Sequence, residues 1–272
     1  MVRKYYNNKK DVKIIFNSLS EVVKFNREVE RTSFYRGYHD SDEVSSLRDK
    51  FTGTHSYEEA EDLLLHGWDE MAEELTEKLG NIKANSNKYK NKTIYNVSGY
   101  QACVPRYLQG IPTNMISNKR IVTKQKVLNI TKDFGYGWKV SSRTIKEESI
   151  KVLKLVNQLE LQGYRCNVDI CFVSKHISKH NGENTYDCIS IRIKNASQKM
   201  NIKQMAFPLV HPSMFRRIMF GLMERLPECE NYGYSYGCCT EYNETKHLFK
   251  DEYYIPRIVK EKEIVDIEKY KC

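Results

Sequence analysis

Histidine and cysteine residues gather around residues 171–188, where their spacing could bind a metal ion. His176 and His180 have the spacing of two zinc ligands, and Cys171 and Cys188 stand on either side of them. Both cysteines also fall at apolar positions of expected strands, where cysteine behaves as a small hydrophobic residue. No second ligand pair follows at a fingerlike spacing. The sequence therefore favours a solvated loop over a zinc site, and we expect no metal ion and no cofactor.

Signatures of catalysis are missing from the sequence. It has no Gly-x-Ser-x-Gly elbow, no matched cysteine and histidine signature, and no phosphate loop of the Gly-x4-Gly-Lys type. The segments "DVKI" at 11–14 and "EKEIVDIEK" at 261–269 hold the acidic and lysine residues of a metal nuclease, but motifs this short arise by chance. We therefore expect binding rather than enzymatic activity.

Basic residues outnumber acidic ones, with 44 Lys and Arg against 35 Asp and Glu and a formal net charge of +9. Such a surplus favours contact with nucleic acid through counterion release, although a lysine-rich surface can also serve solubility alone. The 19 tyrosines offer faces on which bases can stack. The basic residues form three clusters: Arg3, Lys4, Lys9 and Lys10; Lys83, Lys88, Lys90 and Lys92; and Lys119, Arg120, Lys124 and Lys126.

The segment "HPSMFRRIMFGLMERLPE" at 211–228 predicts a helix that begins at Pro212 after a capping His211. At ~100° per residue one half of this helix is apolar, and Arg216, Arg217 and Phe220 fall on the other half. An aromatic ring between guanidinium groups can stack on a base or anchor a protein. The arginines can equally pair with carboxylates of a neighbouring helix, which would bury the segment on both sides, and we favour this internal interpretation. The candidate residues for binding nucleic acid or a partner are Lys119, Arg120, Lys124, Lys126, Arg216, Arg217 and Phe220.

The first part of the chain predicts mainly helices. The expected elements are a strand at 12–16, a helix from Ser18 or Ser20 to about Arg27, a helix that a Ser56–Glu59 capping box opens and Gly67 ends, and a helix at 68–79. A polar, basic connector follows at 81–92. Residues 93–116 contain Pro105 and Pro112 but are too apolar for a solvated loop, so we expect a rigid, packed, irregular segment there.

The second part predicts a mixed sheet with helices packed on its faces. The expected elements are strands at 127–131, 165–173, 187–194 and 252–258, a covering helix at 144–162 opened by Thr144 and Glu147, and a shorter helix from Asn201. The fold class is therefore α/β or α+β. We expect an N-terminal helical region over 1–92, packed on a mixed α/β domain over 93–272.

The order strand, helix, strand, strand, helix also resembles the von Willebrand A-type arrangement. The metal site of that fold needs Asp-x-Ser-x-Ser after its first strand. The corresponding stretch here offers only Asp133 and then the distant Ser141 and Ser142. The resemblance therefore stops short of a metal-dependent adhesion site.

Three stretches together resemble an uncharacterised family of tailed-phage and prophage proteins: "FTGTHSYEEAEDLLLHGW", "VPRYLQGIPTNM" and "HPSMFRRIMF". The resemblance implies a phage-encoded protein in the cytoplasm of an infected bacterium, and it carries no known activity. The N-terminus lacks a signal peptide and no run is apolar enough to span a membrane, so we expect no membrane partner and eight reduced cysteines. Two functions remain: a non-enzymatic protein that associates with nucleic acid, or an assembly factor that binds a protein or itself.

Overall fold

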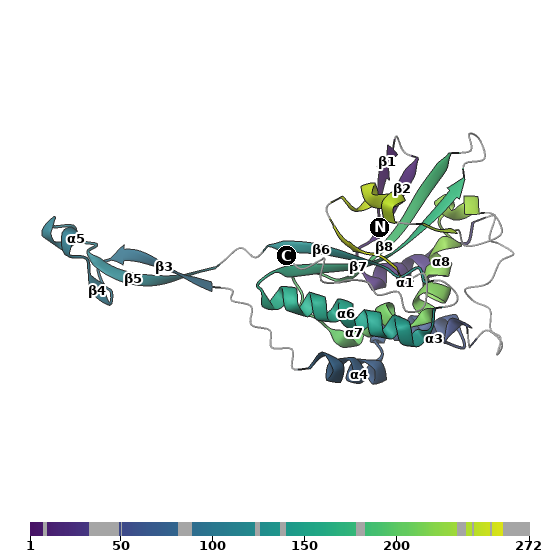
Figure 1. The fold of residues 1–272 in the computed structure, drawn as a ribbon, viewed down its shortest axis with the longest axis horizontal. Coiled ribbons are helices and arrows are strands. Elements are labelled where there is room, and N and C mark those ends of the chain that lie inside the picture. Colours follow the sequence, from purple (N-terminus) through teal and green to yellow (C-terminus); the bar gives the residue numbers. More distant parts are fainter. Residues whose placement is uncertain are drawn as a thin grey trace.

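The structure is a computed structural model, shown in Figure 1. It describes residues 1–7, 10–32, 49, 51–80, 89–122, 126–136, 140–177, 183–232, 238–240, 242–250 and 252–257. The described residues form two parts, each with its own sheet. The arm comprises residues 89–122, and the body comprises the other described residues.

A seven-stranded mixed sheet lies at the centre of the body, with the order β1-β2-β8-β7-β6-β10 and β9 paired with β7. Its strands are β1 (Val2–Tyr6), β2 (Asp11–Phe16), β6 (Val127–Asp133), β7 (Arg165–Ile177), β8 (Asn184–Lys194), β9 (Cys238–Cys239) and β10 (Tyr253–Ile255). Strand β6 runs parallel to β7 and β10, and β2 runs parallel to β8, whereas β7 and β8 are antiparallel. The expected mixed sheet and its strand pairing are confirmed.

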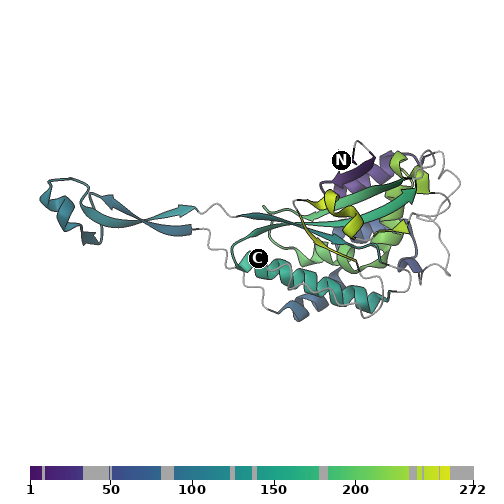
Figure 2. The ribbon, with the colours of Figure 1, turned by 45° about the horizontal axis from the view of Figure 1, so that its top comes forward.

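Helices gather on one face of this sheet (Figures 1 and 2). They are α1 (Leu19–Glu28), α3 (Tyr57–His66), α4 (Asp69–Leu79), α6 (Ser142–Leu161), α7 (Ile202–Val210), the π-helix η2 (Met214–Met219) and α8 (Phe220–Met223). The main core lies between them and the apolar side chains of the central strands, such as Ile130, Val168 and Ile191. A smaller apolar cluster joins β7 and β8 to η4 (Lys246–Phe249) and β10. The chain also forms η3 (Pro227–Tyr232) and α9 (Tyr242–Thr245).

Side-chain caps set the beginnings of several helices. Ser18, Ser56 and Asn201 each accept a hydrogen bond from the backbone N–H three residues later, as the sequence predicts. Helix α6 differs, because Ser141 rather than Thr144 is its cap, and the helix therefore begins two residues earlier than expected. Its apolar face lies against the core as predicted, and Leu159 is buried there.

The arm is a second, three-stranded antiparallel sheet that projects from the body (Figures 1 and 2). It consists of β3 (Tyr89–Asn96), β4 (Gln101–Ala102), the short helix α5 (Val104–Leu108) and β5 (Met115–Val122). The expectation of an irregular segment at 93–116 is therefore wrong. Pro105 sits in the first turn of α5, where proline costs no hydrogen bond, and Pro112 lies between α5 and β5.

The sheets also change how the chain is divided. Strands β1 and β2 belong to the seven-stranded sheet, and residue 92 lies inside β3. Strand β6 begins at residue 127 as expected, whereas Lys119 and Arg120 lie on β5, in the other sheet. Residues 33–48, 178–182 and 258–272 lie outside the described residues.

Candidate nucleic-acid interface

Positive charge concentrates in one segment that includes the arm. No acidic residue lies between Glu77 and Asp133, and no histidine lies there either. The segment has eleven basic residues: Lys78, Lys83, Lys88, Lys90, Lys92, Arg106, Lys119, Arg120, Lys124, Lys126 and Lys132. Because the whole chain has a net charge of +9, the residues outside this segment sum to −2. The basic character of the protein therefore belongs to the arm and the residues that flank it.

Two lysines face each other across the long ribbon of the arm. Strands β3 and β5 pair over eight residues each, and Lys92 lies directly opposite Lys119 in their register. Both side chains are exposed. Like charges in directly opposed positions destabilise an antiparallel pair, and no ion pair relieves either lysine among the residues that the structure describes. A bound polyanion would relieve this repulsion.

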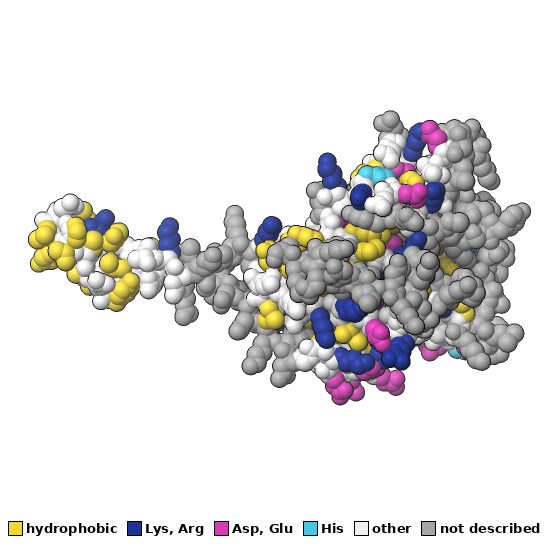
Figure 3. Space-filling model, viewed as in Figure 1, with side chains coloured by type: hydrophobic (Ala, Val, Ile, Leu, Met, Phe, Trp, Pro, Cys, Tyr) yellow, Lys and Arg dark blue, Asp and Glu magenta, His cyan; other side chains and the backbone are white. Residues whose placement is uncertain are grey.

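The tip of the arm exposes large apolar side chains. Leu108 is 77% exposed, Val97 is 67% exposed and Tyr107 is 66% exposed, and Tyr100 and Val104 are exposed to a similar extent. Figure 3 shows these hydrophobic side chains covering the end of the arm farthest from the body. Contiguous apolar surface of this kind marks sites where soluble proteins contact a partner.

Specific contacts fix the shape of this tip. The guanidinium of Arg106 donates hydrogen bonds to the backbone oxygen of Thr113 at 2.9 Å and to its hydroxyl at 3.0 Å. The same group lies 4.4 Å from the centre of the Tyr95 ring, a cation–π contact. At Gly99 a Cβ atom would lie 2.1 Å from the backbone oxygen of Ile116, so only glycine fits. The apolar surface is therefore held in one arrangement before any partner binds.

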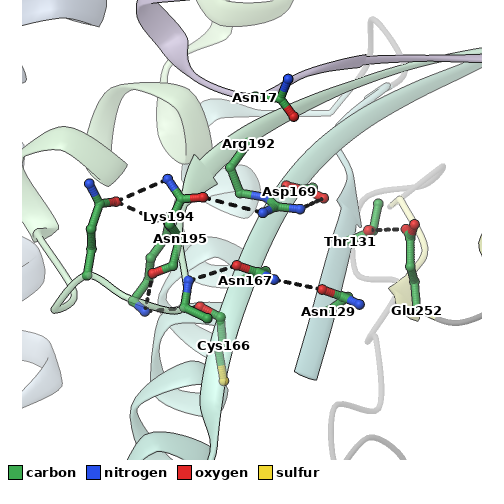
Figure 4. Close-up of polar contacts among 12 residues, drawn as sticks. Asn17, Asn129, Thr131, Cys166, Asn167, Asp169, Arg192, Lys194, Asn195 and Glu252 are labelled. Atoms are coloured by element: carbon green, nitrogen blue, oxygen red, sulfur yellow. Dashed lines mark hydrogen bonds and ion pairs between the residues drawn. The ribbon is translucent and has the colours of Figure 1, made fainter. Parts of the chain in front are cut away.

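Charged side chains in the body, by contrast, are paired with one another. Figure 4 shows that the guanidinium of Arg192 donates hydrogen bonds to the carboxylate of Asp169, and that the hydroxyl of Thr131 donates one to Glu252. Glu252 also accepts from the ammonium of Lys13 at 2.6 Å. Burial raises the pKa of the Asp169 carboxyl, although the Arg192 contact opposes this shift. These groups satisfy each other and serve the fold.

Lys132 and Glu148 form a second buried pair, with 2.7 Å between the ammonium and the carboxylate. Both side chains are almost completely buried. Lys132 also donates to the backbone oxygen of Pro256 at 2.6 Å. Burial raises the pKa of the Glu148 carboxyl, and the attraction of Lys132 opposes this rise. Lys132 is one of the eleven basic residues of the segment, but its side chain is buried in the body and cannot contact a ligand there.

The structure places three of the four candidate residues between 119 and 126 in or beside the arm. Lys119 and Arg120 lie on β5, and Arg120 is opposite Asn91 in the register. Lys126 is exposed and precedes β6. Lys124 lies outside the described residues. That these residues bind nucleic acid stays a prediction, now joined to Lys92, which the sequence pattern alone did not single out as their partner.

Two of the three candidates in the segment 211–228, Arg217 and Phe220, are buried and not available as a binding surface. Arg217 is 0% exposed and donates to the backbone oxygens of Thr54 and His55. Phe220 is buried and packs edge-on against another ring, and Arg216 is half-buried against Phe51. The apolar half of the wheel is buried as predicted, and the other half is buried too, because residues 52–55 and Asn26 of α1 lie against it. Both sides of the segment are internal.

Metal-type residues do not converge in the described part of the chain, where no group of three His, Cys, Asp or Glu side chains is placed to hold an ion. His176 lies on β7, His180 lies outside the described residues, and Cys171 and Cys188 are buried free thiols. Burial raises the pKa of the Cys171 thiol. The carboxylate of Asp133 is buried and accepts hydrogen bonds from Gly135 N–H at 2.9 Å and the Tyr254 hydroxyl at 2.7 Å.

Comparisons with known proteins give a family and no activity. The family described as "Domain of unknown function (DUF7192)" matches residues 4–270. No curated protein and no solved structure matches the chain. None of the described helices is long and apolar enough to cross a membrane.

Proposed function

The chain belongs to the DUF7192 family, whose function is unknown, and we propose that it associates with nucleic acid through its arm. The observation that supports this proposal is the exposed pair Lys92 and Lys119, which face each other within a segment that has no acidic residue. Nothing in the arm neutralises these charges. A phosphate backbone supplies the missing counter-charge.

The shape of the arm suits a double helix. A two-stranded antiparallel ribbon fits the major groove of B-DNA, and cations along it can neutralise phosphates on both sides. The tip carries Tyr100, Tyr107 and Leu108, which are the side-chain types that stack on bases or wedge between them. Because these contacts use charge and stacking, we expect binding with little sequence preference.

The biological setting of this activity is also a proposal. The three stretches that resemble tailed-phage proteins support a phage-encoded protein that acts in the cytoplasm of an infected bacterium.

The test measures affinity for a fluorescent duplex by anisotropy between about 50 and about 200 mM salt. Affinity should fall steeply, with a slope of roughly −0.9 per phosphate contacted, and Lys92→Ala/Lys119→Ala should reduce that slope by about 2. The matched control is Lys154→Ala/Lys199→Ala, which removes the same charge from two exposed positions on the body. Equal slopes for the two double variants would place binding elsewhere.

A protein partner is the second candidate, and the exposed tip is the observation that favours it. Apolar side chains such as Leu108 are typical anchors of protein interfaces. Leu108→Ser discriminates the two functions. If it abolishes self-association or capture of a partner while the unmodified protein shows no salt-dependent binding to duplex or single strand, the assembly function is correct.

A further inference from the structure

A cavity of about 680 Å³ lies in the body between α4, the first turns of α6 and the end of α7. This volume is within the ~300–1,000 Å³ that small-molecule sites occupy. Its wall combines apolar side chains, including Trp68 and Met71, with the cations Lys78, Arg143 and Lys146. A cavity with one apolar side and one cationic side suits a ligand that has both characters.

The apolar side of the cavity is built around a fixed tryptophan. The Trp68 ring meets His211 edge-on, with 4.9 Å between ring centres, and His211 stacks on Phe207 at 5.0 Å. Gly53 closes this wall with a φ of +87°, and a Cβ atom there would lie 2.8 Å from Pro212. The indole is therefore held in place, and it can receive a flat ring without reorganisation.

His211 adds a neutral hydrogen-bond donor to the wall. Its Nδ1 accepts from the backbone N–H of Ser213 at 3.1 Å, which is the capping role that the sequence predicts and which leaves the proton on Nε2. Burial lowers the pKa of the ring to about 4, so the ring is uncharged near neutral pH. His211 lines the cavity, and among the described residues no hydrogen-bond partner lies at its Nε2.

The cationic side carries more positive than negative charge. Lys146 and Lys78 both contact Glu74, with 2.6 Å from Lys78 to the carboxylate, and they lower the pKa of that carboxyl. Arg143 pairs with Glu147 at 3.0 Å. Three cations thus meet two carboxylates, and the first amides of α6 lie beside them. One bound anionic group would neutralise the remaining positive charge.

We propose that the cavity binds a nucleoside monophosphate, with the base against Trp68 and the phosphate at Arg143 and Lys146. A free base would leave the cations unused, and inorganic phosphate would leave the apolar wall exposed to water. The site lies in the body and does not depend on the activity proposed for the arm.

Fluorescence of Trp68 tests the proposal directly. The chain has two tryptophans, so Trp138→Phe leaves Trp68 as the single indole. Adenosine monophosphate, and the guanosine, cytidine and uridine monophosphates in parallel, are titrated into this protein. At least one should give a saturable change, and its nucleoside, inorganic phosphate and benzoate should each bind about ten-fold more weakly. Benzoate that binds as tightly as the nucleotide would reassign the site to aromatic acids.

Two variants locate the phosphate. Arg143→Gln and Lys146→Met should each weaken nucleotide binding by about ten-fold, the effect expected for loss of one hydrogen bond to a charged group. Lys151→Met is the matched control, because this exposed lysine of α6 does not line the cavity. Arg143 has a side chain that is 87% exposed, so its replacement tests the site even if Lys146→Met impairs folding. No saturable change with any of the four nucleotides, or equal weakening by the control, overturns the proposal.

Discussion

The two sheets of this protein treat charged and apolar side chains in opposite ways. In the seven-stranded sheet of the body, Lys132, Asp169 and Arg192 lie within ion pairs, and the apolar side chains of the central strands, such as Ile130 and Val168, are buried. In the three-stranded sheet of the arm, Lys92 faces Lys119, and Leu108 is exposed to solvent. These charges of the body are paired within the protein itself, so they contribute to its stability. The arm leaves its groups unsatisfied, so its residues point to a partner.

The largest expected effect breaks a pair inside the body. Lys132→Met leaves the Glu148 carboxylate buried without its cation and should lower the free energy of unfolding by about 3–5 kcal/mol. Urea denaturation followed by circular dichroism measures this loss. Lys132→Met/Glu148→Leu, which removes both charges, should restore most of it. If the double variant is no more stable than the single one, the loss does not come from the unpaired Glu148 carboxylate of α6.

Apolar truncation compares the body and the arm on equal terms. Leu159→Ala removes a buried side chain of α6 and should cost about 2–5 kcal/mol of unfolding free energy. Leu108→Ala removes an exposed side chain of the tip and should stay within about 0.5 kcal/mol. Both values come from the same denaturation series. A cost above about 1 kcal/mol for Leu108→Ala would mean that the tip packs on the protein itself.

The third comparison concerns pH. The pKa of His211 is about 4 in the fold, against about 6.5 in an unfolded chain. Its contribution to stability is therefore complete above about pH 6.5 and is lost as the pH falls toward 4. Compared with His211→Asn, the unmodified protein should lose on the order of 1 kcal/mol more between pH 7 and about pH 5.

The arm should not share this pH response, because no carboxylate or histidine lies between Glu77 and Asp133. Binding of the duplex by folded protein should therefore change little over the same pH range. Parallel loss of affinity and stability would show that the body takes part in binding.

Much of the body could be predicted from the sequence because its patterns are local. The alternation in β8 and the apolar face of α6 each report burial within one element, and the Ser56 cap is a short-range signal. The burial of Arg217 has no comparable signature, because residues 52–55, which cover that side of the helix, are distant in the sequence. Helical spacing reports which face is apolar, and it does not report whether another segment covers the polar face.

The candidate interface was predicted in part. Lys119 and Arg120 were identified from charge density, which is visible in the sequence. The role of residues 93–116 was misjudged because apolar content normally means burial, and the sequence offers no direct sign that Val97 and Leu108 are exposed. One sign did exist: an uninterrupted stretch without acidic residues from 78 to 132 marks a segment built differently from its surroundings.

The register of β3 and β5 makes the arm an adjustable spacer. Tyr89 pairs with Val122, so the chain leaves the ribbon beside the point where it enters, and the ribbon's length is independent of the body. Eight residues in a strand span ~26 Å. Removing two facing pairs would shorten this reach by ~7 Å and keep every remaining side chain on its own face. Removing one pair would move every side chain of the outer half of the ribbon to the opposite face. The distance between the tip and the body can therefore change only in steps of two residue pairs if its chemistry is to be preserved.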